Sequence, residues 1–418
     1  MKTKLLFAIT ILFLALQSCD NEGNTLYVKV AKPKYMALED FRASVKVLSP
    51  KSISTSGKIY AYKDIILIND TDRGIHVIDN KDSLHPKKVA FIEIPANKDM
   101  EVKGDYLYAD SLMDLVVFDI SNISSITEVS RLKDVFPAYI VTTFEDDVFF
   151  DYSDDQYNTG DILVGWDIVL EPKTQVEIEA LQQQFFRDDI LMADSAAENS
   201  ATQGQGGSMA RFRIVGGYLY AVDSHAIHIF NIDNLEAPDY VGHVYAGFDI
   251  ETIFNSGQYL FLGSKSGMFI YSIEDAVSPQ LVSEYWHGTA CDPVVVDGNY
   301  AFITLRAGNT CGAVESSLEI VDISNIQNPE LLKTYPMDGP YGLGISNNLL
   351  FICDGSAGLK VYDKSDVENL KLLNNFKDII TYDVIPLEGH LLMVGDNILY
   401  QYKYGGNGIE EISKFPLS

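Results

Sequence analysis

The stretch SLEIVDISNIQNPELLKTY, residues 317–335, decides the fold because altered copies of it recur along the chain. Three clear copies are GLKVYDKSDVENLKLLNNF from Gly358, DLVVFDISNISSITEVSRL from Asp114 and AIHIFNIDNLEAPDYVGHV from Ala226. Each copy begins with a short apolar run that closes on a polar residue. Eight such runs end at Asp79, Asp119, Asp167, Asn231, Ser272, Asp322, Asp363 and Gln401, in steps of 40, 48, 64, 41, 50, 41 and 38 residues. A repeat of about 41 residues therefore organises the chain.

A second marker, a tight turn followed by an aromatic strand, keeps a constant phase with the first. Gly104-Asp105 and Gly298-Asn299 are typical pairs, and they indicate hairpin turns because Gly and Asn tolerate positive φ. In most copies the turn precedes the apolar run by about 14 residues. Each repeat then reads as four short strands, and a proline that suits an edge often opens the last one (Pro238, Pro279 and Pro329).

Four strands per repeat predict an all-β chain folded as a β-propeller of four-stranded blades. One such sheet has two apolar faces and cannot bury both alone, whereas a ring of sheets covers all of them. The count favours eight blades. Seven is the alternative, if Ile162–Asp167, which stands in for the third apolar run, belongs to an insertion instead.

The main insertion is expected at about residues 172–209. Its first part, TQVEIEALQQQFFRDDILM from Thr174, has apolar residues at a weak helical spacing and predicts a helix. Its second part, ADSAAENSATQGQGGS from Ala193, is poor in bulky apolar residues and predicts a mobile segment.

The first 18 residues are predicted to form an export signal. Two lysines, Lys2 and Lys4, precede an apolar run of 12 residues from Leu5, which is shorter than the roughly 20 that a membrane-spanning helix needs. The run ends in Leu16-Gln17-Ser18-Cys19, which resembles the lipobox of bacterial lipoproteins, where the Cys is acylated. We therefore expect Cys19 to hold the protein on a membrane through its acyl chains.

The lipobox resemblance also sets the predicted boundaries and address. Residues 1–18 are the signal peptide, 19–50 a tether and lead-in, and 51–418 a single propeller domain. The expected location is the cell envelope of a Gram-negative bacterium, on the outer membrane, facing either the periplasm or the cell exterior.

The charge of the chain excludes one class of partner. The formal net charge is −28, and removal of residues 1–18 takes away two lysines and no acid, which leaves −30. Nucleic-acid binding needs clustered Lys and Arg to contact phosphates, so no nucleic-acid partner is expected.

The apolar runs of residues 318–325 and 115–122, LEIVDISN and LVVFDISN, resemble the LVIVD repeat. The resemblance extends over most of residues 53–404 and implies an exported bacterial β-propeller. It implies no reaction or ligand, so no catalytic residue carries over. Because Asn231, Ser272 and Gln401 replace the Asp, an Asp-dependent site in every blade is not expected.

Three cysteines remain after Cys19. Cys291 and Cys311 are 20 residues apart in one repeat, and an exported protein favours their pairing as a disulfide. A loop of this length would be stabilised by roughly 3 kcal/mol. Cys353 alternates with strand residues and is expected to be a buried thiol. His287 beside Cys291 could form a metal or nucleophile pair, but no second cluster with ligand spacing follows.

The acidic stretch from Asp151 to Asp161 offers weak calcium candidates: Asp151, Asp154, Asp155 and Asp161. Carboxylates are ligands that Ca²⁺ prefers, yet the spacing does not match the twelve-residue calcium loop. A solvated acidic loop is therefore the favoured interpretation, and no cofactor is expected.

The resulting hypothesis is a non-catalytic, lipid-anchored propeller that presents a binding or scaffold surface to a protein or glycan. The alternative is a propeller-type hydrolase with a metal or acid site at the mouth of the central channel. Asp and His side chains converging there with shifted pKa values would favour the enzyme.

Overall fold

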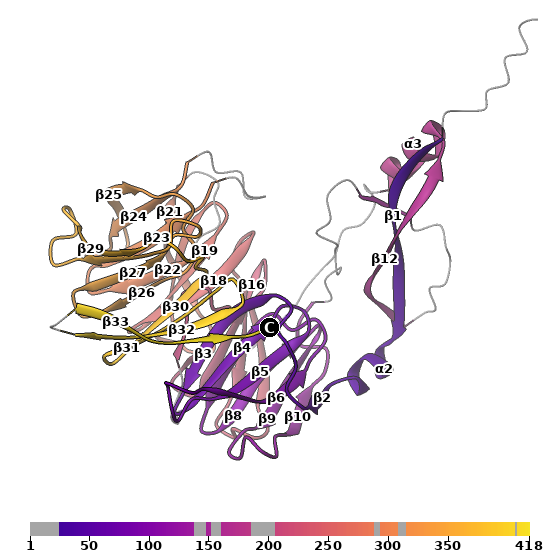
Figure 1. Ribbon diagram of the computed structural model, residues 1–418, viewed down its shortest axis with the longest axis horizontal. Coiled ribbons are helices and arrows are strands. Elements are labelled where there is room, and N and C mark those ends of the chain that lie inside the picture. The colour runs from indigo at the N-terminus through magenta and orange to yellow at the C-terminus, as the bar shows by residue number, and fades with distance from the viewer. Residues whose placement is uncertain are drawn as a thin grey trace, which may run out of the picture. The chain divides into compact units, whose positions relative to one another are not determined.

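The computed structural model describes residues 25–137, 148–151, 160–184, 205–287, 293–307, 315–405 and 408–418. The chain forms two compact units, whose strands are labelled in Figure 1. The smaller unit comprises Met1–Asp40 and Ile140–Leu191. The larger unit comprises Phe41–Tyr139 and Met192–Ser418.

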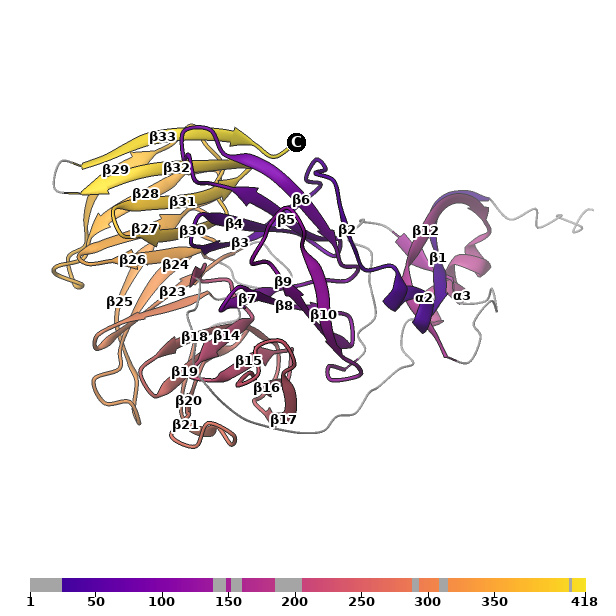
Figure 2. The same ribbon diagram turned by 90° about the horizontal axis from the view of Figure 1, so that it is seen from below.

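The larger unit contains seven consecutive antiparallel sheets, here called blades 1 to 7 (Figure 2). Blade 1 has β3 (Ser56–Tyr62), β4 (Ile65–Asp70), β5 (Gly74–Asp79) and β6 (Lys87–Glu93), and blade 2 has β7 (Met100–Lys103), β8 (Tyr106–Ser111), β9 (Asp114–Asp119) and β10 (Thr127–Leu132). Blade 3 has β14 (Phe212–Val215), β15 (Tyr218–Val222), β16 (Ala226–Asn231) and β17 (Asp239–Tyr245). Blade 4 has β18 (Ile250–Ser256), β19 (Tyr259–Ser264), β20 (Gly267–Ser272) and β21 (Gln280–Trp286).

The remaining blades repeat the same order. Blade 5 has β22 (Val294–Asp297), β23 (Tyr300–Leu305), β24 (Ser317–Asp322) and β25 (Glu330–Pro336). Blade 6 has β26 (Leu343–Ser346), β27 (Leu349–Cys353), β28 (Leu359–Asp363) and β29 (Lys371–Phe376). Blade 7 has β30 (Asp383–Leu387), β31 (His390–Gly395), β32 (Ile398–Gly405) and β33 (Gly408–Pro416). Blade 1 gains β2 (Lys46–Leu48) beside β6 and β13 (Gln205–Gly206) beside β3.

The turns and edges follow the sequence signals. Gly104 and Asp105, at φ of 59° and 70°, make the turn between β7 and β8 that the sequence predicts. The three predicted edge prolines each directly precede an outermost strand, namely β17, β21 and β25. An outermost strand has one unpaired side, so it tolerates a missing donor at its start.

Each blade buries both of its faces. In blade 1, Tyr60 and Leu67 pack into a cluster with Val102 and Phe118 of blade 2. Their strand neighbours Ile59, Ala61, Ile66 and Ile68 face the other way and pack against Leu392 and Leu399 of blade 7. Full burial of one such apolar side chain contributes about 1.5–3 kcal/mol, which a single sheet in water would forgo on at least one face. The physical reason given for a propeller therefore holds.

The ring closes without a strand shared between its first and last blades. The innermost strands contact one another in the cycle β3, β7, β14, β18, β22, β26, β30 and back to β3. At the seam, the Ile53 N–H donates to Leu417 O at 2.8 Å. Gln401 exchanges two side-chain hydrogen bonds with Asn80, at 3.0 and 2.7 Å. The predicted β-propeller is thus confirmed.

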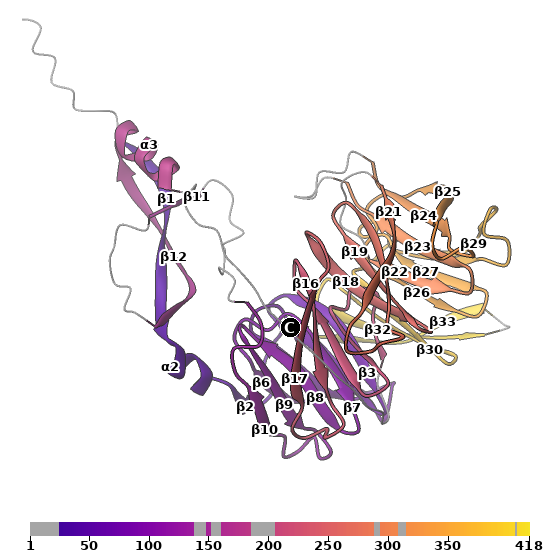
Figure 3. The same cartoon turned by 180° about the vertical axis from the view of Figure 1, so that it is seen from behind.

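The eighth sheet of the chain lies in the smaller unit (Figure 3). Strands β1 (Leu26–Ala37) and β12 (Asp161–Lys173) pair antiparallel, and β11 (Val148–Phe150) pairs parallel to β1. Helix α3 (Gln175–Gln184) follows β12, and helix α2 (Leu38–Ala43) follows β1. Ile162–Asp167, counted as a third apolar run, belongs to β12 and pairs with β1. The chain therefore has eight sheets but seven blades, the count given as the alternative.

Candidate functional site

In blades 1 to 6 the polar residue that closes the third strand stabilises the loop that follows, whereas Gln401 of blade 7 lies within β32. Asp119 Oδ1 accepts the N–H of Ser121 at 2.8 Å, and Asp322 Oδ1 accepts that of Ser324 at 2.8 Å. Asn231 makes the same bond to Asp233 N–H at 2.7 Å, and the Ser272 hydroxyl accepts Glu274 N–H at 3.3 Å. The position needs an oxygen acceptor that stabilises a turn. This explains why Asn and Ser replace Asp without loss of the repeat.

Most predicted site residues lie outside the described residues: Cys19, Cys291, Cys311, Asp154 and Asp155. Their acylation, pairing or metal binding therefore stays a prediction. Within the described ranges, no three His, Cys, Asp or Glu side chains gather in a way that would hold a metal ion.

The two described calcium candidates are not brought together. The Asp151 N–H donates to Ala31 O at 2.9 Å, whereas Asp161 lies opposite Ala37 on β1. Six residues of strand separate these two points of β1, which is roughly 20 Å. These two carboxylates therefore cannot share one ion in this arrangement.

The remaining single-residue predictions concern buried side chains. Cys353 on β27 is a free, fully buried thiol, as predicted, and burial raises its pKa. His76 and His228 are buried on strands and contact Asp70 and Asp223, at 3.3 and 2.7 Å. The prediction for Cys353 is confirmed, and the two histidines are packed within the fold beside carboxylates.

The central channel contains a piece of the insertion, which the sequence did not reveal. Gln205 and Gly206 of β13 pair antiparallel with Ala61 and Tyr60 on the channel side of β3. The following residues run on to Arg211, whose N–H donates to Asp99. We call residues 205–211 the channel segment. The prediction that the insertion is mobile as far as Ser208 is wrong for residues 205–208, because these residues pack inside the ring.

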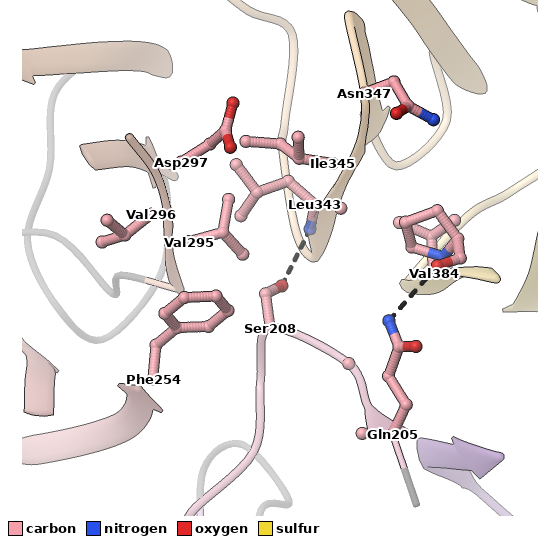
Figure 4. A pocket seen from close by; sticks show the side chains of 14 residues that line it. Gln205, Ser208, Phe254, Val295, Val296, Asp297, Leu343, Ile345, Asn347 and Val384 are labelled. Carbon is pink, nitrogen blue, oxygen red and sulfur yellow. Dashed lines mark hydrogen bonds between the residues drawn. The ribbon is translucent and has the colours of Figure 1, made fainter. Parts of the chain in front are cut away.

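Further hydrogen bonds fix the channel segment to blades 4, 6 and 7, and those made by Ser208 and Gln205 are drawn in Figure 4. The Ser208 hydroxyl accepts Leu343 N–H of blade 6 at 2.8 Å, and Gln205 Nε2 donates to Pro386 O of blade 7 at 3.2 Å. Ala210 O accepts the N–H of Ile253 in blade 4 at 2.8 Å. Beside the segment remains a cavity of about 200 Å³, bounded by Phe254, Val295, Leu343 and Val384 among others. Ligand pockets usually measure 300–1,000 Å³, so the space left in the channel is small.

Small residues in the channel segment are needed because an aspartate lies against it. A Cβ on Gly207 would fall well inside contact distance of both carboxylate oxygens of Asp383. Asp383 is fully buried, and its oxygens accept the N–H groups of Ile59, at 3.4 Å, and Val384, at 3.0 Å. Burial raises the pKa of Asp383 to about 7. The Gly-Gly-Ser run was the only sequence signal for this close packing.

We call the end of the channel where the innermost strands begin the N-terminal mouth. Lys58 Nζ of blade 1 lies 3.2 Å from Asp99 Oδ2 of blade 2. The same oxygen accepts Phe212 N–H at 2.8 Å. Asp110 accepts the N–H groups of Lys98 and Asp99, at 2.9 and 2.8 Å, and burial raises its pKa to about 6. Asp99 therefore holds the end of the channel segment in place, and Asp110 holds the chain that leads into β7.

The other side of the N-terminal mouth is partly aromatic. The Arg306 guanidinium lies 4.1 Å from the ring centroid of Tyr341 and donates to its hydroxyl at 2.9 Å. Tyr341 in turn meets Tyr382 edge to face, with ring centroids 5.1 Å apart. Burial raises the pKa of Glu251, and the positive charges of Lys265, Arg211 and Arg306 oppose that rise. The mouth thus combines charges from several blades that are distant in sequence.

Exposed aromatic side chains gather at the rim on the same side as the N-terminal mouth. Tyr245, Phe248 and Trp286 are 55, 67 and 62% exposed. Phe248 contacts Tyr245 and His225 edge to face, with centroids 5.9 and 5.5 Å apart. The nearly buried Phe269 ring supports Trp286 at 5.8 Å and lies 3.5 Å from the Cβ position of the neighbouring Gly247. We call His225, Tyr245, Phe248, Phe269 and Trp286 the rim aromatic cluster.

One family model matches two parts of the chain. The LVIVD repeat is matched at residues 96–134 and 287–336. No curated protein sequence matches the chain.

Three solved structures resemble the chain at low identity. A functionally unknown protein from Desulfotomaculum acetoxidans has 12% identity and a TM-score of 0.49, and the match covers 86% of this chain and 96% of that one. BamB from Moraxella catarrhalis has 9% identity and a TM-score of 0.48, with 89 and 97% covered. Hsv2 from Kluyveromyces lactis has 9% identity and a TM-score of 0.47, with 87 and 100% covered. The chain is therefore a seven-bladed β-propeller that contains LVIVD repeats in two parts of its sequence.

Proposed function

We propose that this protein is a lipid-anchored propeller of the bacterial cell envelope that binds a partner without catalysing a reaction. The observation that carries the proposal is the rim aromatic cluster. Three large rings remain more than half exposed there, although their apolar surface would favour burial. A fixed support holds them, because Phe269 packs beneath Trp286. Rigid, exposed aromatic rings bind partners at low entropic cost.

A neutral glycan is the ligand class that suits the cluster best. The exposed rings do not form a continuous apolar face, since polar groups stand among them. His225 contacts Phe248, and the exposed Asp249 follows Phe248 and pairs with Lys265 at 3.0 Å. A sugar ring offers C–H groups that stack on aromatic faces and hydroxyls that bond to carboxylate and imidazole. The net charge of −28 disfavours an anionic polysaccharide. A protein partner is the other possibility.

The channel supports binding at the rim more than catalysis at its centre. Raised pKa values of Asp110, Glu251 and Asp383 are what a hydrolase would need there. However, the carboxylate oxygens of Asp110 and Asp383 already accept hydrogen bonds from backbone N–H groups. Gly207 and Gly342 also pack closely against the Asp383 side chain. A substrate therefore has no access to these two carboxyls while the channel segment is in place.

The anchor is the second part of the proposal. The predicted acylation of Cys19 supports it. Among the described residues no helix is long and apolar enough to cross a membrane. Mass spectrometry of the protein purified from a Gram-negative host would show a mature chain beginning at an acylated Cys19. A chain that retains residues 1–18, or begins elsewhere without lipid, would rule the anchor out.

The binding role is tested with a Cys19→Ser chain on an array of neutral and anionic glycans. We expect binding to neutral glycans, and a loss of at least tenfold in Trp286→Ala, since central aromatic residues dominate such interfaces. Leu331→Ala is the matched control, because Leu331 is 49% exposed on the outer strand of another blade. Equal binding by both variants would place the ligand elsewhere. Stoichiometric metal in the purified protein, with hydrolysis of an arrayed glycan, would favour the enzyme instead.

A further inference from the structure

The smaller unit has an apolar end that the proposed binding role does not use. Four of its large apolar side chains are at least half exposed: Leu26, Tyr27, Leu170 and Val176, at 51, 70, 65 and 75%. We call these four the apolar tip. We propose that the apolar tip lies in the headgroup region of the same bilayer that holds the acylated Cys19. This inference rests on the proposed anchor and goes beyond it.

The strand register places all four side chains at one end of the unit. Leu26 lies opposite Lys173 and Tyr27 opposite Pro172, while Leu170 lies opposite Lys29. Helix α3 begins at Gln175, two residues after β12 ends, so Val176 sits in its first turn at the same end. Neighbouring residues of a strand point to opposite faces, so Leu26 and Tyr27 make the tip apolar on both sides of the strand pair.

The rest of the unit does not share this character. Val30 and Ala31, four and five residues along β1, are fully buried, and Ile178 of α3 is 6% exposed. Further along, an ion pair joins the two strands, with Lys34 2.5 Å from Asp167. Among the described residues of the unit, strong apolar exposure is therefore concentrated at the tip rather than spread over a face.

The length of chain before the tip identifies the bilayer as its partner. Cys19 and Leu26 are seven residues apart, and a fully extended chain spans at most about 3.3–3.6 Å per residue. The tip therefore cannot lie more than roughly 25 Å from the acylated residue. The tether makes the contact intramolecular in effect, so even a weak apolar interaction with lipid is populated. Tyr27 fits this site, since tyrosine is enriched at membrane interfaces.

The test places a tryptophan at the tip and asks whether lipid quenches it. The two natural tryptophans, Trp166 and Trp286, are replaced by Phe, and Tyr27→Trp supplies the reporter. Lys34→Trp is the matched control, because Lys34 lies on the same strand, half exposed, seven residues further along. The acylated proteins are reconstituted in phosphatidylethanolamine–phosphatidylglycerol vesicles with and without a nitroxide at carbon 5 of the acyl chain.

We expect at least twofold quenching at position 27 and none at position 34. In the Cys19→Ser chain, both positions should remain unquenched at the same protein concentration. Acylated protein without quenching at position 27 overturns the tip contact and leaves the anchor standing. Equal quenching at both positions would mean that the whole strand lies on the bilayer, which also overturns it. Mass spectrometry of the same sample separates these results from a failure of acylation, which would remove both proposals.

Discussion

Replacing Asp383 by Asn should remove a pH dependence of stability that the buried carboxyl creates. Burial raises the pKa of Asp383 from 3.8 to about 7. Between these values the folded protein keeps a proton that the unfolded chain has released. The free energy of unfolding therefore falls as the pH rises through this window, by roughly 4 kcal/mol over the whole of it.

The variant should behave differently because Asn stays neutral. Near the acid end of the window both proteins carry a neutral side chain with a carbonyl acceptor, so their stabilities should agree within about 1 kcal/mol. As the pH rises, only the wild type must ionise a buried group. Of the total effect, about 2–3 kcal/mol falls between pH 5 and pH 8, and the difference should move in favour of Asp383→Asn by that amount.

Equilibrium urea unfolding at several values between pH 5 and pH 8 measures this difference. The range stays above the sequence pI of about 4.5, where solubility is lowest. Asp396→Asn is the control, because Asp396 is an exposed carboxylate of the same blade and should follow the wild type. Parallel curves for Asp383→Asn and wild type would refute the reasoning, as would a variant that loses stability relative to the wild type with rising pH.

Three further substitutions test separate parts of the architecture, each by urea unfolding at pH 7. Gly207→Ala should destabilise by about 1–3 kcal/mol through overpacking in the channel, whereas Gly405→Ala, which has open space around its Cβ position, should stay within about 0.5 kcal/mol. Asp119→Ala should cost about 1 kcal/mol and Asp119→Asn much less, and equal losses would contradict the turn role. Arg42→Ala should cost about 1–3 kcal/mol because the buried carboxylate of Asp114 loses its bidentate partner but keeps Arg131 at 3.1 Å, and adding Asp114→Asn should recover part of that loss.

The propeller could be predicted because its signals are local and repeated. The pair Gly104-Asp105 and the run ending at Asp119 each report a turn or a strand by themselves, and their constant spacing reports the repeat. The run at Ile162–Asp167 has the same local pattern, yet its strand pairs with β1 from the start of the chain. An apolar run indicates a strand but does not name its partner. The blade count therefore could not be settled from the pattern alone.

The mouth of the channel could not be predicted, because its residues come together only through ring closure. Lys58, Asp99 and Asp383 belong to three blades and Arg211 to the channel segment, and the four have no common spacing. The channel segment was missed for the opposite reason. Its small residues are typical of mobile chain, and only the buried Asp383 beside Gly207 explains why nothing larger fits.

The path of the channel segment constrains the order in which the ring is completed. Blade 2 finishes beside Met113, near the N-terminal mouth, where Val135 N–H donates to Met113 O. The channel segment runs antiparallel to β3, so it enters the channel at the end opposite the N-terminal mouth and leaves it at that mouth, where β14 begins. If the channel segment is already in place, the ring can close around it when blade 7 docks on blade 1. If the ring closed first, the channel segment would have to pass through the finished channel. Docking of blade 7 on blade 1 is thus expected to be the last step of folding. A chain shortened before blade 7 should leave the channel segment exposed to solvent.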